Sequence, residues 1–302
     1  MYLNVPKPFD GSSTKQAEGG SSDCLLVPVA IYPDPTRVNG YLVMSEVMYA
    51  DGTPHPSNGR ATIDDEDDDF WFGFEQEYIL FGRNNIPLQW KDINNPGLGD
   101  FQQGPYYCSI GGDRAFGRGI SNDHLLKCLD AGIGICGTNA EVMASQWEFQ
   151  IGTLNMLQAC DDLIMARYIL GRITENHGCY VSYSPKPLSK WNGSGGHTNF
   201  STNKMGEENG LEEIINACNK LEKNHKMHIE SYGDNNDLRL TGRHETSDIN
   251  SFSYGIADRN CSVRIPLSVS IEKKGYLEDR RPAANFDPYV VANLLVRTVC
   301  SQ

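Results

Sequence analysis

The sequence has no long apolar run and no excess of positive charge. None of its apolar runs approaches the roughly 18 residues of a membrane-spanning helix, so we expect no membrane partner. Lysine and arginine number 26 against 39 aspartates and glutamates, which gives a formal charge of −13 at pH 7. Nucleic-acid phosphates repel a chain of this charge. The composition therefore argues against a nucleic-acid-binding protein and against a membrane protein.

Cysteine is present, but not in the spacing of a metal site. The nine cysteines are an odd number, and no two of them form a CxxC pair. The sequence thus gives little support to a zinc site or a disulfide framework. The first residues, MYLNVPKPFDGSS, have neither the basic region nor the apolar core of a secretory signal. We expect reduced thiols and a cytoplasmic location.

Glycine-rich phosphate-binding motifs are also missing. Neither GxxxxGK[ST] nor a GxGxxG between a strand and a helix occurs. If the protein uses a nucleotide, metal ions and arginines must hold its phosphates. Arginines that suit phosphates and carboxylates do occur in the later part of the chain: Arg239, Arg259, Arg264 and Arg280. Ion pairs with the surplus acidic residues are the alternative interpretation.

Length and local pattern predict a small β-rich unit followed by a larger mixed unit. At about 150 residues per domain, the chain allows two domains or one large one. The first 23 residues are typical of a loop, residues 24–48 are β-prone with an internal turn, and residues 70–81 predict an aromatic strand. Helices are predicted in four later segments, with short β-prone stretches between them: 121–131, 156–176, 207–224 and 287–298.

Two glutamates in the aromatic strand indicate a cation site. Glu75 and Glu77 are two residues apart, so both side chains point to one face of the strand. Adjacent like charges on one sheet face repel each other by up to about 1 kcal/mol, and a divalent cation is the simplest compensation. A solvated strand face is the alternative.

Three further residues are ambiguous when taken alone. Glu141 and Glu148 are seven residues apart, so one regular strand would place them on opposite faces. They converge only if the chain breaks near residues 144–146, and two surface acids are otherwise the simpler interpretation. His197 lies in WNGSGGHTNFS, where glycines let the backbone approach a ligand closely. A lone histidine is nevertheless more often structural than a ligand.

The ordered set of motifs resembles the eukaryotic-type glutamine synthetases. The resemblance covers almost the whole chain, in the family's order and with near-family spacing, and is carried by FDGSSTKQAEGGSSD, WFGFEQEY, QGPYYCSIGGDRAFGR, GTNAEVMASQWEFQIG, NGSGGHTNFST, EENGLEEI, RLTGRHETSDIN, RNCSVRIP and KKGYLEDRRPAANFDPY. It implies an α+β fold. A small N-terminal β-grasp domain, residues 1–63, would precede a catalytic α/β domain, residues 64–302, with a curved antiparallel sheet flanked by helices.

The resemblance implies ATP as co-substrate and two or three Mg²⁺ or Mn²⁺ ions per site. One ion would be held by three glutamates, matched by Glu77, Glu141 and Glu148. Another would be held by two glutamates and a histidine, matched by Glu75, Glu278 and His197. Oxygen donors with one imidazole suit Mg²⁺ or Mn²⁺ better than zinc.

The resemblance also assigns substrate roles residue by residue. Residues matching the family's glutamate site are Asn192, Gly193, His197, Arg239 and Arg280. Residues matching its ATP site are Trp71, Ser201, Arg259, Arg264 and Tyr276. Catalysis would use Arg259 and Arg264 on the phosphates, Glu245 as a proton acceptor on a closing flap, and Asp10, which a neighbouring subunit would contribute to bind ammonium.

The implied activity is ATP-dependent ligation of ammonia to glutamate through γ-glutamyl phosphate, in a decamer of two stacked pentameric rings. Family members carry tens of residues before the DGSST loop, so we expect the β-grasp domain to lack its first strand or strands. Two alternatives are a ligase for another amine and a non-catalytic or assembly-impaired relative. Glu245 and Asp10 favour ammonia, because carboxylates handle a charged ammonium, and the complete set of six metal-ligand matches favours catalysis.

Overall fold

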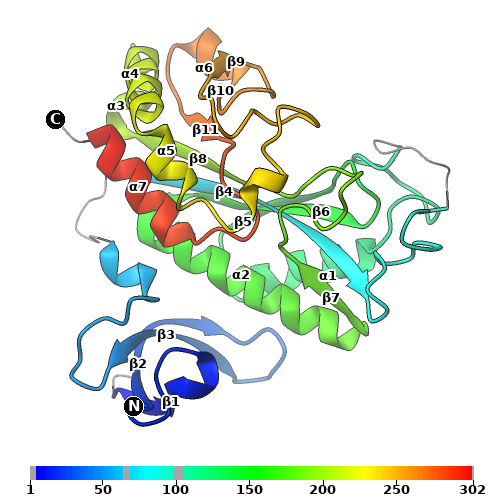
Figure 1. Ribbon diagram of the computed structural model, residues 1–302, viewed down its shortest axis with the longest axis vertical. Helices are drawn as coiled ribbons and strands as arrows, with labels where there is room; N and C mark the ends of the chain where they lie inside the picture. The colour runs from blue at the N-terminus through cyan, green and yellow to red at the C-terminus, as the bar shows by residue number, and fades with distance from the viewer. Residues whose placement is uncertain (1–4, 64–68, 98–104, 301–302) are drawn as a thin grey trace.

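The computed structural model describes residues 5–63, 69–97 and 105–300, which form a small sheet, a large sheet and the helices that pack on them (Figure 1). No helix in these ranges is both long enough and apolar enough to cross a membrane. No disulfide joins the nine cysteines, all of which lie in the described residues.

The small sheet lies at the N-terminal end of the chain. It is antiparallel with the order β1-β2-β3, and its strands are β1 (Lys7–Asp10), β2 (Asp23–Pro33) and β3 (Tyr41–Tyr49). The strands predicted within residues 24–48 are thus confirmed. The loop predicted for the first 23 residues is wrong at residues 7–10, where Lys7 pairs opposite Leu26. A tetrapeptide containing proline has little strand preference, so the partner strand rather than the local sequence produces β1.

The large sheet has eight strands in the order β5-β6-β4-β8-β11-β10-β9, with β7 also paired to β4. Its strands are β4 (Phe70–Gly82), β5 (Ile135–Ala140), β6 (Gln146–Asn155), β7 (Cys179–Ser182), β8 (Gly196–Thr202), β9 (Tyr254–Ile256), β10 (Val263–Ile265) and β11 (Leu277–Asp279). Among the strands that the structure describes, only β9 and β10 pair in parallel. The predicted aromatic strand is confirmed as β4, at the centre of the sheet.

The four predicted helices are confirmed within three residues at each end. They are α1 (Arg118–Asp130), α2 (Met156–Asn176), α4 (Gly210–Lys223) and α7 (Pro288–Cys300). The short helices α3 (Asn203–Gly206), α5 (His225–Ile229) and α6 (Leu267–Glu272) were not predicted. Each has at most six residues, too few for a clear helical period. The large sheet, which is mostly antiparallel, and its separate helices confirm the predicted α+β class.

The alternation of β4 separates the core from an open face. Phe72, Phe74 and Tyr78 are fully buried and belong to the main hydrophobic core. Helix α2 contacts β4, β6 and β7 and runs along the sheet (Figure 1). Since side chains of a strand alternate between faces, the residues at odd numbers point away from this core. Glu75 and Glu77 are therefore carried on the other face.

A polar network joins the small sheet to the large unit. The Tyr32 hydroxyl donates to Asp162 Oδ1 at 2.9 Å. Arg60, which follows the small sheet, donates to Glu46 at 2.7 Å and to Asp161 at 2.9 Å. Tyr289 of α7 donates to the same aspartate at 2.6 Å. The start of α2 therefore serves as the anchor for both β2 and β3.

Candidate active site

A polar cavity of about 360 Å³ opens on the face of the large sheet opposite the main core. Its lining contains both the acidic and the basic candidates from the sequence. The acidic, basic and imidazole side chains that line it are Glu75, Glu77, Glu141, Glu148, His197, Arg239, His244, Glu245, Arg259, Arg264, Glu278 and Arg280. Asn192 and Gly193 line it as well.

Sheet register explains why these acids meet. Glu77 of β4 lies directly opposite Glu148 of β6. On the other side of β4, Glu75 lies opposite His197 of β8. Strand β11 pairs with β8, and this brings Glu278 close to His197. Four strands thus deliver their carboxylates and one imidazole to the same end of the cavity.

A turn between two strands brings in Glu141. Strand β5 ends at Ala140 and β6 begins at Gln146, so a turn at residues 141–145 interrupts the strand. This is the interruption that Glu141 and Glu148 need in order to converge. Ser145 has a φ of 70°, in the left-handed region. Glu141 is 8% exposed and Glu148 is 5% exposed. The interpretation of these two residues as surface acids is therefore wrong.

Burial and mutual repulsion disfavour the charged forms of these glutamates. Burial, followed by the field of Glu77, raises the pKa of Glu141 to about 8. Burial also raises the pKa of Glu77 and holds the pKa of Glu148 well above its ordinary value. Burial lowers the pKa of His197 well below its usual range. A cluster of this kind is favourable when a cation neutralises the carboxylates.

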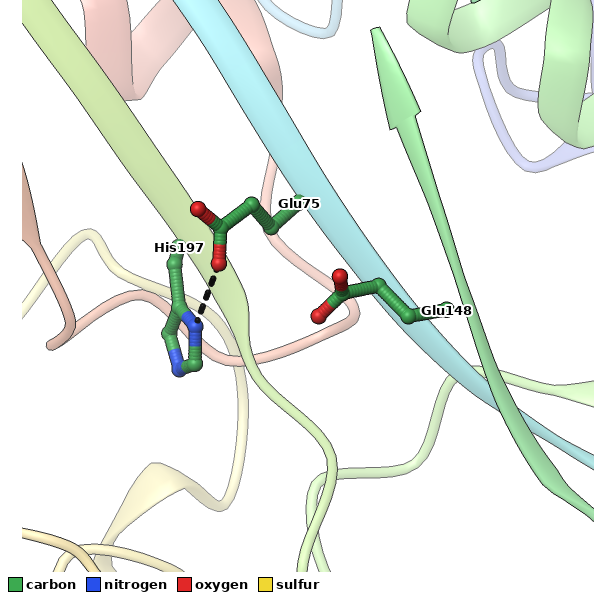
Figure 2. Close-up of side chains that lie close together, drawn as sticks. All are labelled: Glu75, Glu148 and His197. Atoms are coloured by element: carbon green, nitrogen blue, oxygen red, sulfur yellow. Dashed lines mark hydrogen bonds and ion pairs between the residues drawn. The ribbon is translucent and has the colours of Figure 1, made fainter. Parts of the chain in front are cut away.

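Two groups of donor atoms are close enough to share a cation. Glu77, Glu141 and Glu148 form one group, and Glu75, Glu148 and His197 form the other, with donor atoms within 4.8 Å of one another. Figure 2 shows the second group converging from β4, β6 and β8, with His197 Nδ1 3.2 Å from Glu75 Oε2. Glu278 Oε1 lies 3.7 Å from the same nitrogen.

Two of the arginines that line the cavity form ion pairs with Glu278, and a third donates to backbone carbonyl oxygens. Arg280 and Arg264 both contact Glu278, at 2.5 and 2.9 Å, which agrees with the ion-pair interpretation. The Nε atom of each, however, is buried without a hydrogen-bond partner among the described residues. Arg239 instead donates to the carbonyl oxygens of Arg280 and Arg281. Guanidinium donors therefore remain available to a bound anion.

The glycine-rich turn before β8 is packed too tightly for side chains. A Cβ on Gly193 would lie 2.3 Å from the carbonyl oxygen of Pro185. A Cβ on Gly195 would lie 2.5 Å from Arg239 Nη2 and 2.8 Å from His197 Nε2. These glycines let the turn pass directly over the arginine and the histidine.

A second cavity of about 330 Å³ adjoins the first. Trp71, Ser201 and Tyr276 line it, and Glu75 and Gln150 line both cavities. Trp71 is 42% exposed, although its Nε1 donates a hydrogen bond to Asn203 Oδ1. The three residues matched to the nucleotide site are therefore brought together, beside the carboxylates.

Glu245 and Asp10 are placed differently. Glu245 lies on a half-exposed segment at the rim of the first cavity, 4.0 Å from Arg259, and both it and His244 have positive φ angles. Asp10 lies in the small sheet and does not line the cavity of its own chain. Hydrogen bonds from Ser12 and Ser13 lower the pKa of Asp10 to about 2, so it is charged at neutral pH.

Sequence reasoning missed several residues of this site. Asn139 donates to Glu141 at 3.0 Å, Gln150 to Glu148 at 2.8 Å, and Asn199 to Glu75 at 3.0 Å. Asn139 and Gln150 each stand two residues from the glutamate they bind. The same-face rule used for Glu75 and Glu77 would have found Gln150, which shares β6 with Glu148, but not Asn139, because Glu141 lies beyond the end of β5. Tyr107 and Gln146 also line the first cavity, and no spacing signal marks them.

Comparison with known proteins gives one consistent result. Residues 60–225 match the family described as glutamine synthetase, catalytic domain. The chain is 50% identical over 301 residues to glutamine synthetase of Homo sapiens, covering 96% of this chain and 80% of that protein. It is 48% identical over 299 residues to glutamine synthetase of Yarrowia lipolytica, covering 97% of this chain and 81% of that protein.

A solved structure agrees on the fold. The cryo-electron microscopy structure of Plasmodium falciparum glutamine synthetase superposes with a TM-score of 0.76 at 17% identity. The match covers 98% of this chain and 66% of that one. These results confirm the resemblance indicated by the sequence motifs.

Proposed function

Because the chain belongs to the glutamine synthetase family, we propose that its two adjoining cavities catalyse the ATP-dependent ligation of ammonia to L-glutamate. The products are L-glutamine, ADP and phosphate, and γ-glutamyl phosphate is the intermediate. The observation that carries the proposal is the meeting of five buried or half-buried carboxylates, one imidazole and several guanidinium groups next to a pocket lined by Trp71 and Tyr276. Phosphoryl transfer depends mainly on positioning and charge neutralisation, which such a site supplies.

The donor set fits divalent cations. Carboxylate oxygens with one imidazole suit Mg²⁺ or Mn²⁺, and buried carboxylates that repel one another are stabilised by such ions. We assign two or three ions to the site, held by Glu77, Glu141 and Glu148 and by Glu75, Glu278 and His197. When bound, these ions would neutralise the negative charge of the ATP phosphates.

Glutamate is assigned to the region around the glycine-rich turn. Arg239 and Arg280 are buried and suit its carboxylate, and the unpaired Nε of Arg280 is a further donor. Asn192, Gly193 and His197 complete the proposed contacts. This arrangement would hold the γ-carboxylate in place for attack on the terminal phosphorus of ATP.

ATP is assigned to both cavities. Trp71, Ser201 and Tyr276 would hold its ring and ribose, because aromatic faces suit a purine. Arg259 and Arg264 lie in the first cavity and would contact the phosphates. Glu75 and Gln150 stand where the two cavities join. The reacting phosphate would thus lie over the carboxylate cluster.

Ammonium needs a proton acceptor and a closed site. Glu245 at the rim is suited to accept the proton that makes ammonia a nucleophile. Closing its turn would keep water from hydrolysing the acyl phosphate. Asp10 of a neighbouring subunit is proposed to bind ammonium, since the charged Asp10 does not line the cavity of its own chain.

We further propose a decamer of two stacked pentameric rings, a cytoplasmic location, and a division into domains at residues 63 and 64. Ten chains of 33.6 kDa would have a mass of about 336 kDa, which mass photometry measures directly. A single-chain mass at working concentration would contradict the ring. The proposed location is supported by the cysteines, none of which forms a disulfide.

The test is glutamine formation from glutamate and ammonium by the purified protein. Turnover should require both ATP and Mg²⁺ or Mn²⁺, and omission of either should abolish it. Replacing ammonium with methylamine or hydroxylamine tests the ligase for another amine, and we expect ammonium to give the higher kcat/KM. Absence of turnover in a protein that still binds Mn²⁺ and ATP would overturn the proposed reaction and favour the non-catalytic alternative.

A further inference from the structure

The side chain of Gln76 is buried directly behind the carboxylate cluster. It lies on β4 between Glu75 and Glu77, and strand alternation places it on the opposite face. It is 0% exposed. Its Nε2 donates to the carbonyl oxygens of Glu77, at 2.8 Å, and Ala284, at 3.0 Å. This amide therefore joins the metal-facing strand to a segment more than 200 residues later.

Arg167 of α2, on the core side of the sheet, binds both Gln76 and Ala284. Its Nε and Nη2 atoms donate to Gln76 Oε1 at 2.7 and 2.5 Å. Its Nη2 and Nη1 atoms donate to the carbonyl oxygens of Ala284, at 3.1 Å, and Phe286, at 2.9 Å. The guanidinium lies over the rings of Phe286, at 4.8 Å, and Tyr183, at 5.3 Å.

Every hydrogen-bond acceptor described for Arg167 is neutral. Burial lowers the pKa of its guanidinium to about 10, so it is still charged at neutral pH. No carboxylate of the described residues lies within ion-pair distance of this guanidinium, and the field of Asp287 offsets its desolvation only in part. Its hydrogen bonds instead go to the two segments that it joins, Gln76 of β4 and residues 284–286.

The segment that Arg167 binds, residues 284–286, follows the strand on the opposite side of the cavity from β4. Residues 282–286 follow β11, which carries Glu278, and Arg280 stands between them. The carbonyl oxygen of Pro282 accepts from Gly196 N at 2.9 Å, and Ala284 N donates to Ser194 O at 3.0 Å. Two backbone hydrogen bonds therefore hold the glycine-rich turn before β8 against residues 282–284.

We propose that Arg167 is a positioning residue that, together with Gln76, sets the spacing between β4 and the segment after β11. It thereby fixes Glu75 and Glu77 relative to Glu278 and Arg280 across the cavity. This inference rests on the proposed function, because that function makes the spacing matter. Arg167 does not line either cavity, so it acts only through the backbone segments it holds.

The test compares two arginines of one helix. Arg167→Met removes the crosslink, whereas Arg172→Met removes an exposed arginine of α2 that pairs with Glu175 at 3.2 Å. Mn²⁺ affinity of the nucleotide-free protein is measured by electron paramagnetic resonance, and glutamate KM by steady-state kinetics. We expect about 10-fold weaker Mn²⁺ binding and a raised glutamate KM for Arg167→Met, with no change for Arg172→Met. Arg167→Lys should fall between them, since one ammonium cannot reach both partners as a fork does.

Hydrogen exchange gives a readout independent of metal and activity. Amides of residues 283–286 and of β8 should exchange faster in Arg167→Met and not in Arg172→Met. If Arg167→Met does not fold, Arg167→Lys and Gln76→Leu provide the same comparison, with the same expected changes. A lowered melting temperature with unchanged Mn²⁺ affinity and glutamate KM would overturn the inference, since Arg167 would then be only structural. Wild-type protein that neither binds Mn²⁺ nor makes glutamine would instead overturn the proposed function.

Discussion

At the scale of single residues, the site combines groups that are costly to bury with groups that can compensate them. Glu148 belongs to both donor groups and is 5% exposed. Glu245 lies at the rim, outside both groups, with a half-exposed side chain. Substitution of Glu148 should therefore weaken metal binding, whereas substitution of Glu245 should lower the rate of the reaction.

Glu148→Gln should weaken both cation positions at once, because the two groups share this carboxylate. We expect at least about a tenfold loss of Mn²⁺ affinity. The metal-free variant should melt no lower than wild type, since one of several repelling carboxylates has been removed. Titration with Mn²⁺ and a thermal melt in chelator check both. Glu213→Gln on the exposed face of α4 is the control, and equal Mn²⁺ affinity in the two variants would contradict the assignment.

Glu245→Ala should lower kcat by about 10²- to 10⁴-fold, the usual contribution of a general base. Mn²⁺ affinity should stay within about twofold of wild type, because this residue belongs to neither donor group. Steady-state glutamine formation and Mn²⁺ titration measure the two effects separately. Full turnover in the variant would show that another group accepts the proton from ammonium.

At the scale of helices and strands, packing places a titratable side chain inside the core. His124 of α1 is 1% exposed, its Nε2 lies 2.9 Å from the carbonyl oxygen of Ala166 in α2, and its ring packs on Phe149 of β6. Burial lowers its pKa to about 4. The neighbouring thiol of Cys128 is also buried, which raises its pKa, so it stays protonated at neutral pH as well as in acid.

This histidine predicts an acid-sensitive contact between α1, α2 and β6. Its folded pKa of about 4 lies below the ordinary value of 6.5, so the folded state favours the neutral ring. The stabilisation is present above pH 6.5 and is lost as pH falls toward 4. Linkage gives a loss of about 2 kcal/mol between pH 7 and pH 5. Urea unfolding of wild type and His124→Gln at both pH values checks this, and an equal pH dependence in the two proteins would contradict it.

At the scale of the whole molecule, the small sheet is joined to the large unit both by apolar packing of Tyr32 and Met44 on the main core and by a buried ion network. Arg60 lies between Glu46 of β3 and Asp161 of α2, and its side chain is only 16% exposed. Removing one partner of a buried ion network leaves the other charges uncompensated, which typically costs about 3–5 kcal/mol. The relative position of the small sheet should therefore depend on this residue.

Arg60→Met should destabilise the protein by about 3 kcal/mol or more, measured as the free energy of unfolding in urea. Tyr289→Phe, which removes one hydrogen bond to Asp161, should cost about 1 kcal/mol. Arg37→Met is the matched control, because Arg37 pairs with Asp34 at 3.5 Å but is 71% exposed. An exposed pair contributes about 0–1 kcal/mol. Equal losses for Arg60→Met and Arg37→Met would show that the junction does not depend on the network.

The sequence alone was sufficient for features that depend on local pattern. Helix α2 follows from its apolar spacing over residues 156–176, and the face shared by Glu75 and Glu77 follows from the alternation of a strand. The family followed from ordered motifs, which is why the comparisons agree with it. Local pattern could not produce β1, whose four residues become a strand only through β2.

Only the tertiary structure decided which distant groups meet. Glu148 joins Glu77 because β6 pairs with β4 in one particular register, and Glu141 joins them because a turn at Ser145 reverses the chain. Arg167 lies in none of the quoted motifs, the motif that contains Gln76 gives that residue no role, and their meeting depends on α2 packing beneath β4. A periodic pattern fixes the direction of a side chain along its own element. Register and packing arise from contacts far apart in the chain, so the spacing across the site is a property of the fold.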